Sequence, residues 1–363
     1  MNRFEKKFLS KVGDSWRAAT PGFSLQAFSA GRKIADVQVG RVYDYYDFAS
    51  LTKVLFSATS YMFQHDEKAF GVRDPISKWV PWFPEESPWR IYDLLSHAAG
   101  LTWWCPFYKK VFEQTDAKSS PEEAWSVFQG ILRRKVLSDI KKQGIPAKRP
   151  RLPAIYSDLD LFTLGIALEA IAGASLYDIW TSTRERVGLR DTDFHRFNKP
   201  HFARKLYAPT ETDAWRGKTL QGEVHDENAW SLKGVSAHAG LFGTLDDLSK
   251  WGLFLRSAMR GGSSKHFPSA ATVKLFTKRA IPRSQGDWAL CFMLPGKQNA
   301  SCGKLFSPQS VGHTGFTGPS IWYDPKRDLL VTIVANRVHP TRENKTFPLV
   351  LRPQLHTWIA EEV

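Results

Sequence analysis

The stretch Phe48-Ala49-Ser50-Leu51-Thr52-Lys53, followed by Val54-Leu55-Phe56, decides the fold. Apolar residues recur there every three or four positions after Asp47, a possible helix cap, which predicts an amphipathic helix that begins close to Ser50. Side chains three residues apart share a helix face, so the Lys53 amine can approach the Ser50 hydroxyl. The pair could act as nucleophile and base if burial or another cation lowers the lysine pKa. An unpaired backbone N–H in the first turn could stabilise an oxyanion.

The Ser-x-x-Lys spacing alone is a weak signal, because it occurs at two further places in the chain. Ser138 and Lys141 lie in a charged segment, and Ser301 and Lys304 lie in a loop-like segment beside a glycine. Only Ser50 opens a long apolar helix, so we take Ser50 as the candidate nucleophile.

Length and composition describe a chain of 363 residues with 42% hydrophobic residues, enough for one large domain or two intertwined ones. No apolar run approaches the roughly 18 residues that span a bilayer, and residues 1–7 lack the apolar core of a signal peptide. We therefore expect no transmembrane segment and a cytoplasmic location as written, or a periplasmic or secreted one if a leader was removed. Cys105, Cys291 and Cys302 fit no disulfide or zinc pattern, which predicts reduced core thiols.

The formal charge of +14 raises the question of a nucleic-acid partner. The densest basic segment runs from 133 to 151, and the sequence assigns it no role. No nucleic-acid-binding motif accompanies this segment, and such runs usually form a solvated helix face. We expect a small-molecule or peptide substrate and no nucleic acid; attraction to an anionic polymer or surface is the weaker alternative.

The order of predicted elements divides the chain into three parts. Residues 1–72 form the first part of an α/β domain, with a β-hairpin over 22–41. Residues 73–235 are mostly helical, and residues 236–363 complete the α/β domain. Predicted helices cover 121–137, 159–172 with Gly173 as C-cap, and 348–362, while short strands cover 289–294, 303–306, 318–323 and 329–335. We expect the early hairpin and the late strands to form one antiparallel sheet flanked by terminal helices.

A second candidate element is Tyr156-Ser157-Asp158, on a loop before an apolar helix. A phenol near a lysine can act as a base or a proton shuttle, and Asp158 could orient Lys53 or bind substrate. The alternative is purely structural: a tyrosine that caps the helix and an aspartate that complements its dipole.

A third candidate element is the glycine-rich segment 311–318. Glycine within a strand often marks the close approach of a ligand to the backbone. His313 and Thr314 would offer donors there, and the N–H of Phe316 could be a second oxyanion donor. The alternative is a tight turn with a satisfied histidine.

Together these elements resemble a known superfamily. Phe48–Lys53, Tyr156–Asp158 and His313–Gly315 are similar to the Ser-x-x-Lys, Tyr-x-Asn and Lys/His-Thr-Gly motifs of class C β-lactamases, DD-peptidases and related serine esterases. Leu94–Leu101 and Gly240–Thr244 also resemble recurrent segments of that superfamily, and the likeness covers roughly residues 20 to 360.

The resemblance implies an α/β (α+β) fold in which an antiparallel sheet flanked by N- and C-terminal helices lies beside an all-helical region, with the site in the groove between them. It implies Ser50 as the acyl-forming nucleophile and Lys53 with Tyr156 as the acid/base pair. The amides of Ser50 and Phe316 would form the oxyanion hole. Substrate contacts would come from the remaining motif residues, Asp158, His313, Thr314 and Gly315. We expect no cofactor and no metal.

Two departures from the family motifs bear on the substrate. Asp158 stands where β-lactamases have Asn, and an anion there would repel carboxylate-rich ligands. His313 replaces a Lys, and a neutral histidine offers only a hydrogen bond at pH 7. Both changes argue mildly against an efficient β-lactamase. If His313 protonation tunes carboxylate substrates, their kcat/KM should rise toward about pH 6.

We therefore expect a serine hydrolase that acts through an acyl-enzyme on esters or amides, esterase-like first and D-amino peptidase-like second. The alternatives are a β-lactamase, or a penicillin- or peptidoglycan-binding protein that is acylated without efficient turnover. His225, Asp226 and His238 are expected to be groove lining or structural, because their spacing is unlike that of a zinc site. Trp103-Trp104 is either a pocket wall or core.

Overall fold

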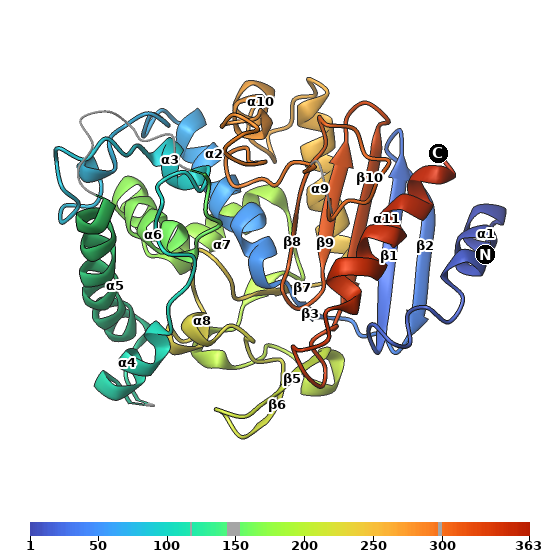
Figure 1. The fold of residues 1–363 in the computed structure, drawn as a ribbon, viewed down its shortest axis with the longest axis horizontal. Coiled ribbons are helices and arrows are strands. Elements are labelled where there is room, and N and C mark those ends of the chain that lie inside the picture. Colours follow the sequence, from blue (N-terminus) through green and yellow to red (C-terminus); the bar gives the residue numbers. More distant parts are fainter. Residues whose placement is uncertain (117, 144–152, 297–299) are drawn as a thin grey trace.

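A five-stranded antiparallel sheet is built from both ends of the chain (Figure 1). The computed structural model describes residues 1–116, 118–143, 153–296 and 300–363. The strands lie in the order β2-β1-β10-β9-β8 and are β1 (Gly22–Ser29), β2 (Arg32–Gly40), β8 (Val311–Thr314), β9 (Ser320–Asp324) and β10 (Leu329–Ala335). β1 and β2 are the predicted hairpin, which turns at Ala30 and Gly31, both with positive φ. The predicted fold class is thus confirmed.

Helices cover both faces of this sheet, as Figure 1 shows. α1 (Arg3–Val12) and α11 (Arg352–Glu361) pack on one face, and α9 (Leu245–Met259) packs on the other. On β10, Leu329, Val331 and Ile333 belong to the core under α1 and α11. Leu330 and Val334 belong to the core on the α9 side. Alternate side chains of a strand point to opposite faces, so a strand covered on both faces is mostly apolar; the one polar residue of β10, Thr332, is buried and hydrogen-bonded to Ser249 of α9.

The middle of the chain forms a helical region beside the sheet (Figure 1). Its helices are α3 (Ile91–Leu95), α4 (Phe107–Gln114), α5 (Pro121–Gln143), α6 (Asp158–Ala172), α7 (Leu176–Val187) and α8 (Glu227–Ser231), and α10 (Ala270–Thr277) follows α9. Gly173 caps α6 in the left-handed conformation, as predicted. Two small sheets join this region to the rest of the chain, and their strands are too short to show a period of two in the sequence. β4 (Asp193–Phe194) pairs with β7 (Leu241–Gly243), which also pairs with β3 (Tyr46–Asp47), and β5 (Pro209–Asp213) pairs with β6 (Lys218–Gln221). The boundaries near 72 and 235 stay a prediction.

Two predicted strands and part of the last predicted helix are wrong in detail. Residues 289–294 contain only isolated bridges at Met293, because Cys291 has a positive φ of 64° that interrupts an extended chain. Residues 304–306 form a bend after a turn at 301–302, and Gly303 between them has a φ of 78°. The last helix begins with a π-helical turn over Phe347–Leu351, in which Leu349 is 71% exposed.

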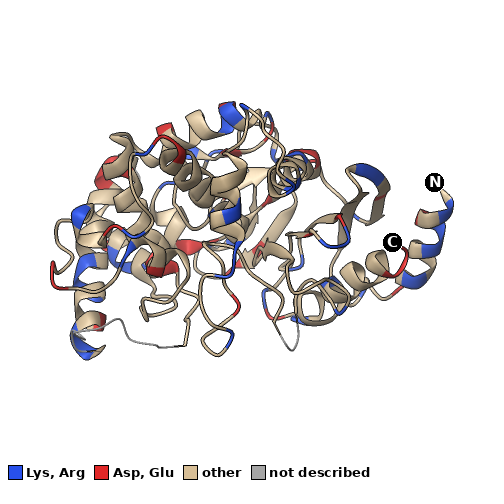
Figure 2. Cartoon of the chain, turned by 90° about the horizontal axis from the view of Figure 1, so that it is seen from above, with Lys and Arg blue, Asp and Glu red and all other residues tan. Residues whose placement is uncertain are grey.

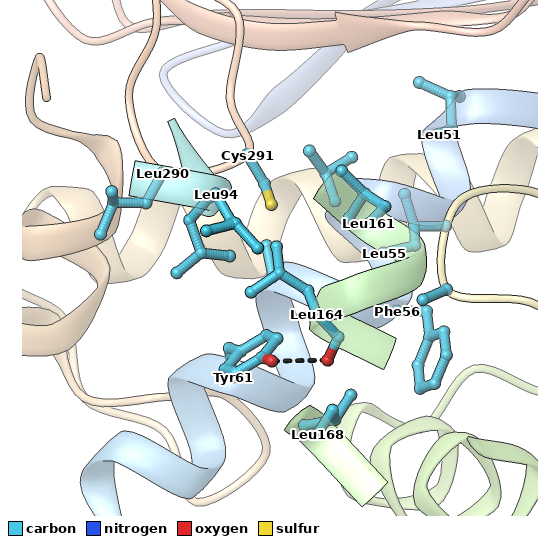
Figure 3. Packing of buried hydrophobic residues seen from close by; sticks show 14 of the residues in the cluster. Leu51, Leu55, Phe56, Tyr61, Leu94, Leu161, Leu164, Leu168, Leu290 and Cys291 are labelled. Carbon is cyan, nitrogen blue, oxygen red and sulfur yellow. Dashed lines mark hydrogen bonds between the residues drawn. The ribbon is translucent and has the colours of Figure 1, made fainter. Parts of the chain in front are cut away.

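The segment that carries Ser50 runs through the centre of the molecule. A 3₁₀ turn (Ala49–Leu51) leads into a π-helical turn (Lys53–Ala58) and then into α2 (Thr59–Asp66). Every residue from 51 to 63 is buried, so the helix is enclosed on all sides instead of being amphipathic. Figure 3 shows this packing: the Tyr61 hydroxyl donates to the Leu164 carbonyl of α6 at 2.6 Å, beside Leu161 and Leu168. Ser50 therefore stands on a rigid support.

Charged residues are spread over many elements. Figure 2 shows Lys and Arg on α1, on the helical region and near the sheet, with Asp and Glu between them. The basic segment predicted over 133–151 begins on α5, and its residues from 144 onward lie outside the described part of the chain. Within the described ranges, no single helix has the length and apolar character needed to cross a membrane; α6 and α7 reach that threshold only together, across a bend of 76°.

Candidate active site

A cavity of about 780 Å³ opens between β8 and the helical region. Predicted residues that line it are Ser50, Tyr156, Asp158, His313, Thr314, Gly315 and Phe316. Lys53 lies directly behind Ser50 and is fully buried. The fold thus brings together three motifs that are more than 100 residues apart in the sequence.

A bent backbone presents Ser50 to this cavity. Ala49, just before it, has a positive φ of 45°, a conformation that costs energy for a residue other than glycine. Asp47 supports the turn: one carboxylate oxygen accepts the Ala49 N–H at 2.8 Å, and the other accepts the His225 N–H at 2.8 Å. The prediction of Asp47 as the helix N-cap is wrong, because Phe48 occupies that position and Asp47 instead holds the turn before it.

The Ser50 hydroxyl oxygen accepts hydrogen bonds from both predicted partners. Lys53 Nζ lies 3.0 Å from it, and the Tyr156 hydroxyl lies 2.8 Å from it. An alcohol, an amine and a phenol therefore meet at one atom. This is the geometry that a serine nucleophile with two proton carriers requires.

The Lys53 ammonium has three oxygen partners. Besides Ser50, it contacts the His238 carbonyl at 3.0 Å and Asp158 Oδ1 at 2.9 Å. Burial favours the neutral amine, but the charge of Asp158 and the contact with Tyr156 outweigh burial and raise the pKa of Lys53 above its ordinary value. The sequence-based condition that its pKa be lowered is wrong: the resting lysine is an ammonium.

Tyr156 is a phenol in the resting site. Burial raises its pKa, and the Lys53 ammonium, which lies 5.0 Å over its ring, opposes that shift only in part. Its ring stacks parallel to Trp288 at a centroid distance of 5.4 Å. The helix cap is Ser157, whose hydroxyl accepts the Leu159 N–H at 3.1 Å, so Tyr156 is not a cap.

The end of β8 is held tightly against the turn before Ser50. A Cβ on Gly315 would lie 2.5 Å from the Phe48 carbonyl oxygen, which only a glycine avoids. Thr317 Oγ1 donates to the Asp47 carbonyl at 2.6 Å. The backbone N–H groups of Ser50 and Phe316 find no acceptor among the residues that the structure describes. Two free donors at such a junction suit a developing oxyanion.

His313 offers an acceptor to the cavity instead of the predicted donor. Its Nδ1–H donates to the Thr314 carbonyl at 2.9 Å, so Nε2 carries the lone pair, buried and without a partner in the described structure. Burial, with the nearby Lys53 charge, lowers the pKa of His313 to about 3. The expectation that this histidine protonates near pH 6 is therefore wrong for the resting site.

A cationic wall, which the sequence analysis missed, faces the same cavity and consists of Arg337, Lys345 and Arg352. Among the described residues, all three hydrogen-bond only to backbone carbonyls and have no carboxylate partner. Burial, reinforced by neighbouring arginines, lowers the pKa of Arg337 to about 10 and that of Arg352 to about 9. Arg342, beside them, is neutralised by Glu211 and Glu227. No motif signals these residues, because Arg337 and Arg352 lie 15 positions apart in the sequence with Lys345 between them.

The histidines and aspartate considered as metal ligands separate in the structure. His225 turns to Glu211 at 3.0 Å, whereas His238 Nε2 lies 3.0 Å from Asp226 Oδ1. Asp158, Asp226 and His238 are close enough to share a cation, with ligand atoms within 4.8 Å of one another. The Lys53 ammonium already supplies a positive charge there, through its 2.9 Å contact with Asp158. The absence of a metal stays a prediction.

Comparisons with known proteins agree with this geometry. The family model named Beta-lactamase matches residues 17–352. A Salmonella gallinarum protein named as a D-alanyl-D-alanine carboxypeptidase is 30% identical over 348 residues, which cover 88% of this chain and 76% of that protein.

Two solved structures share the fold. EstCE1, a hydrolase with promiscuous acyltransferase activity, is 18% identical, with a TM-score of 0.66 over 99% of this chain and 98% of its own. The octameric penicillin-binding protein homologue from Pyrococcus abyssi is 18% identical, with a TM-score of 0.68 over 98% of this chain and 76% of its own. The resemblance inferred from the three motifs is confirmed, and the chain belongs to the beta-lactamase family as a serine hydrolase of that type.

Proposed function

We propose that this enzyme hydrolyses an amide bond in a peptide with a free carboxylate, in the manner of a D-amino-acid carboxypeptidase. The carrying observation is that two buried guanidiniums without acidic partners, Arg337 and Arg352, share a cavity with Ser50. A buried charge without a counter-ion is costly, and a carboxylate bound between such groups would remove that cost. The Salmonella relative's name points to the same chemistry. This reverses the order expected from the sequence, which placed esterase-like turnover first.

The proposed reaction needs only the groups around Ser50. Ser50 Oγ attacks the carbonyl carbon while its proton passes to Lys53 in the neutral form, and the amides of Ser50 and Phe316 stabilise the oxyanion. As the C–N bond breaks, the Tyr156 hydroxyl gives its proton to the leaving nitrogen, and Lys53 then reprotonates Tyr156. Water attacks the acyl-enzyme and gives one proton to the neutral Lys53, the bond to Oγ breaks, and Lys53 returns that proton to Ser50 Oγ.

The resting protonation states set the pH dependence of this route. Lys53 must lose a proton before it can accept one from Ser50, and Asp158 raises the lysine pKa. The active fraction therefore grows about tenfold per pH unit below that pKa, so kcat/KM should rise from neutral into alkaline pH.

A matched pair of substrates tests the carboxylate claim. N-benzoylglycyl thioglycolate is a thioester with a carboxylate in its leaving group, and in its methyl ester a neutral ester takes the place of that carboxylate. The wild type should prefer the acid, and Arg337→Met should lose roughly 10- to 100-fold in kcat/KM on the acid alone, because a hydrogen bond to a charged group contributes about 1.5–3 kcal/mol. Equal rates on both substrates would favour the esterase alternative. A stable Ser50 adduct without turnover would favour a penicillin- or peptidoglycan-binding protein.

A further inference from the structure

A buried histidine and a buried aspartate lie behind Tyr156 and take no part in the proposed reaction. His97 and Asp160 are both fully buried, and His97 Nδ1 lies 3.0 Å from Asp160 Oδ2. A pair of this kind is either an ion pair or a neutral pair, and the two arrangements place the proton on different atoms.

A third group at the same nitrogen decides between them. The Ser157 N–H points at His97 Nδ1 from 3.2 Å and has no other acceptor among the described residues. A backbone N–H can only donate, so this contact favours a lone pair on Nδ1 over a proton, and the Ser157 N–H and Asp160 share that lone pair. The contact with Asp160 then requires the carboxyl to hold the proton and donate it. Burial raises the pKa of Asp160 and lowers that of His97, in agreement with this assignment.

When Asp160 is protonated and His97 is uncharged, the imidazole proton lies on Nε2. This atom is buried without a hydrogen-bond acceptor in the described structure. The imidazole meets two aromatic rings edge to face: Tyr156 at 4.9 Å and 67°, and Trp288 at 4.6 Å and 71°. The His97 carbonyl also accepts the Ile155 N–H at 3.0 Å, beside the tyrosine in the chain. His97 therefore holds Tyr156 through both its ring and its neighbouring backbone.

We propose that Asp160 is a protonated carboxylic acid that donates to His97, and that the two act as positioning residues for the Tyr156 phenol. The inference deepens the proposed function, because it concerns the group that protonates the leaving nitrogen. The charged and titratable groups around the pair are Asp158, Asp93, Lys53, His313 and Cys291. The two anions among them disfavour a third negative charge on Asp160.

Two substitutions at one position separate the possibilities. The amide of Asp160→Asn can donate to His97 Nδ1 as the acid does, whereas Asp160→Leu has a similar size and cannot. An amide substrate needs its leaving nitrogen protonated, but p-nitrophenyl acetate releases a stable anion. We expect Asp160→Asn to keep kcat on both, and Asp160→Leu to lose roughly 100-fold on the amide while its ester rate stays unchanged.

Spectroscopy tests the protonation state of the Asp160–His97 pair without any substrate. A wrong assignment of this pair can therefore be told apart from a wrong proposed function. The infrared difference spectrum of the wild type against Asp160→Asn should show the C=O stretch of a protonated carboxyl, and nitrogen NMR should show His97 protonated at Nε2. The proposal would be overturned by a carboxylate band, by Nδ1 protonation, or by Asp160→Asn losing as much activity as Asp160→Leu. If Asp160→Leu kept the full rate on the amide substrate, the pair would only pack in the core and would not position Tyr156.

Discussion

Replacing Asp158 with Asn should move the rising limb of kcat/KM toward lower pH. Asp158 Oδ1 lies 2.9 Å from Lys53 Nζ, and at an effective dielectric constant of about 20 such a pair attracts by about 6 kcal/mol. This attraction is an upper bound for the change in the Lys53 pKa, because the Asp226 carboxylate stays close to Lys53 in the variant. An opposite charge usually moves a pKa by roughly 1–3 units. Without the Asp158 charge, burial becomes the dominant influence on Lys53 and favours the neutral amine. We therefore expect the rising limb of the kcat/KM profile to shift to lower pH by roughly 1–3 pH units.

The assay is kcat/KM for p-nitrophenyl acetate between about pH 5 and pH 10, a neutral substrate that makes no charge contact with position 158. Asp226→Asn is the matched control: it also removes a carboxylate near Lys53, but one already bound to His238 and to the start of α8, so its shift should be smaller. A profile for Asp158→Asn that coincides with the wild type would refute the reasoning. A shift to higher pH would do so too, and would make Asp158 itself the proton acceptor.

Three further predictions concern stability and the shape of the site. Burial lowers the pKa of His195, His313 and His356 to about 3, so the unfolded chain binds more protons between that pH and about 6.5. Urea titrations should therefore show the free energy of unfolding falling as pH drops through this window, by up to about 1.4 kcal/mol per pH unit for each histidine, and a flat curve would contradict these shifts. Gly315→Ala should lower kcat, because its Cβ would push β8 away from the Phe48 carbonyl; an unchanged kcat would argue against that contact. Leu164→Ala should cost about 2–5 kcal/mol in the free energy of unfolding, and a loss below about 1 kcal/mol would show that the core collapses around it.

The convergence of Ser50, Lys53 and Tyr156 could be predicted from the sequence because local patterns report it. Ser50 and Lys53 share one helical segment, and the resemblance of three ordered motifs supplies the long-range link to Tyr156. The antiparallel sheet could also be predicted from the sequence. The strands β1, β2 and β10 are long enough to show their apolar residues, and a turn sequence separates β1 from β2.

The electrostatics of the site could not be predicted in the same way. The Lys53 pKa depends on a carboxylate more than 100 residues away, and burial and that charge oppose each other, so only their geometry decides the sign. The His313 tautomer depends on where one carbonyl lies. Arg337 and Arg352 look like ordinary surface cations in the sequence, and only the fold turns them into a wall of the cavity.

The most direct test of the central claim is the intact mass of the protein after reaction with a fluorophosphonate. The wild type should gain one adduct, which peptide mapping should place on Ser50, and Ser50→Ala should gain none. Ser138→Ala and Ser301→Ala, which remove the other two Ser-x-x-Lys serines, should label like the wild type. An adduct that persists in Ser50→Ala, or one that disappears in either control, would contradict the assignment of Ser50 as the nucleophile.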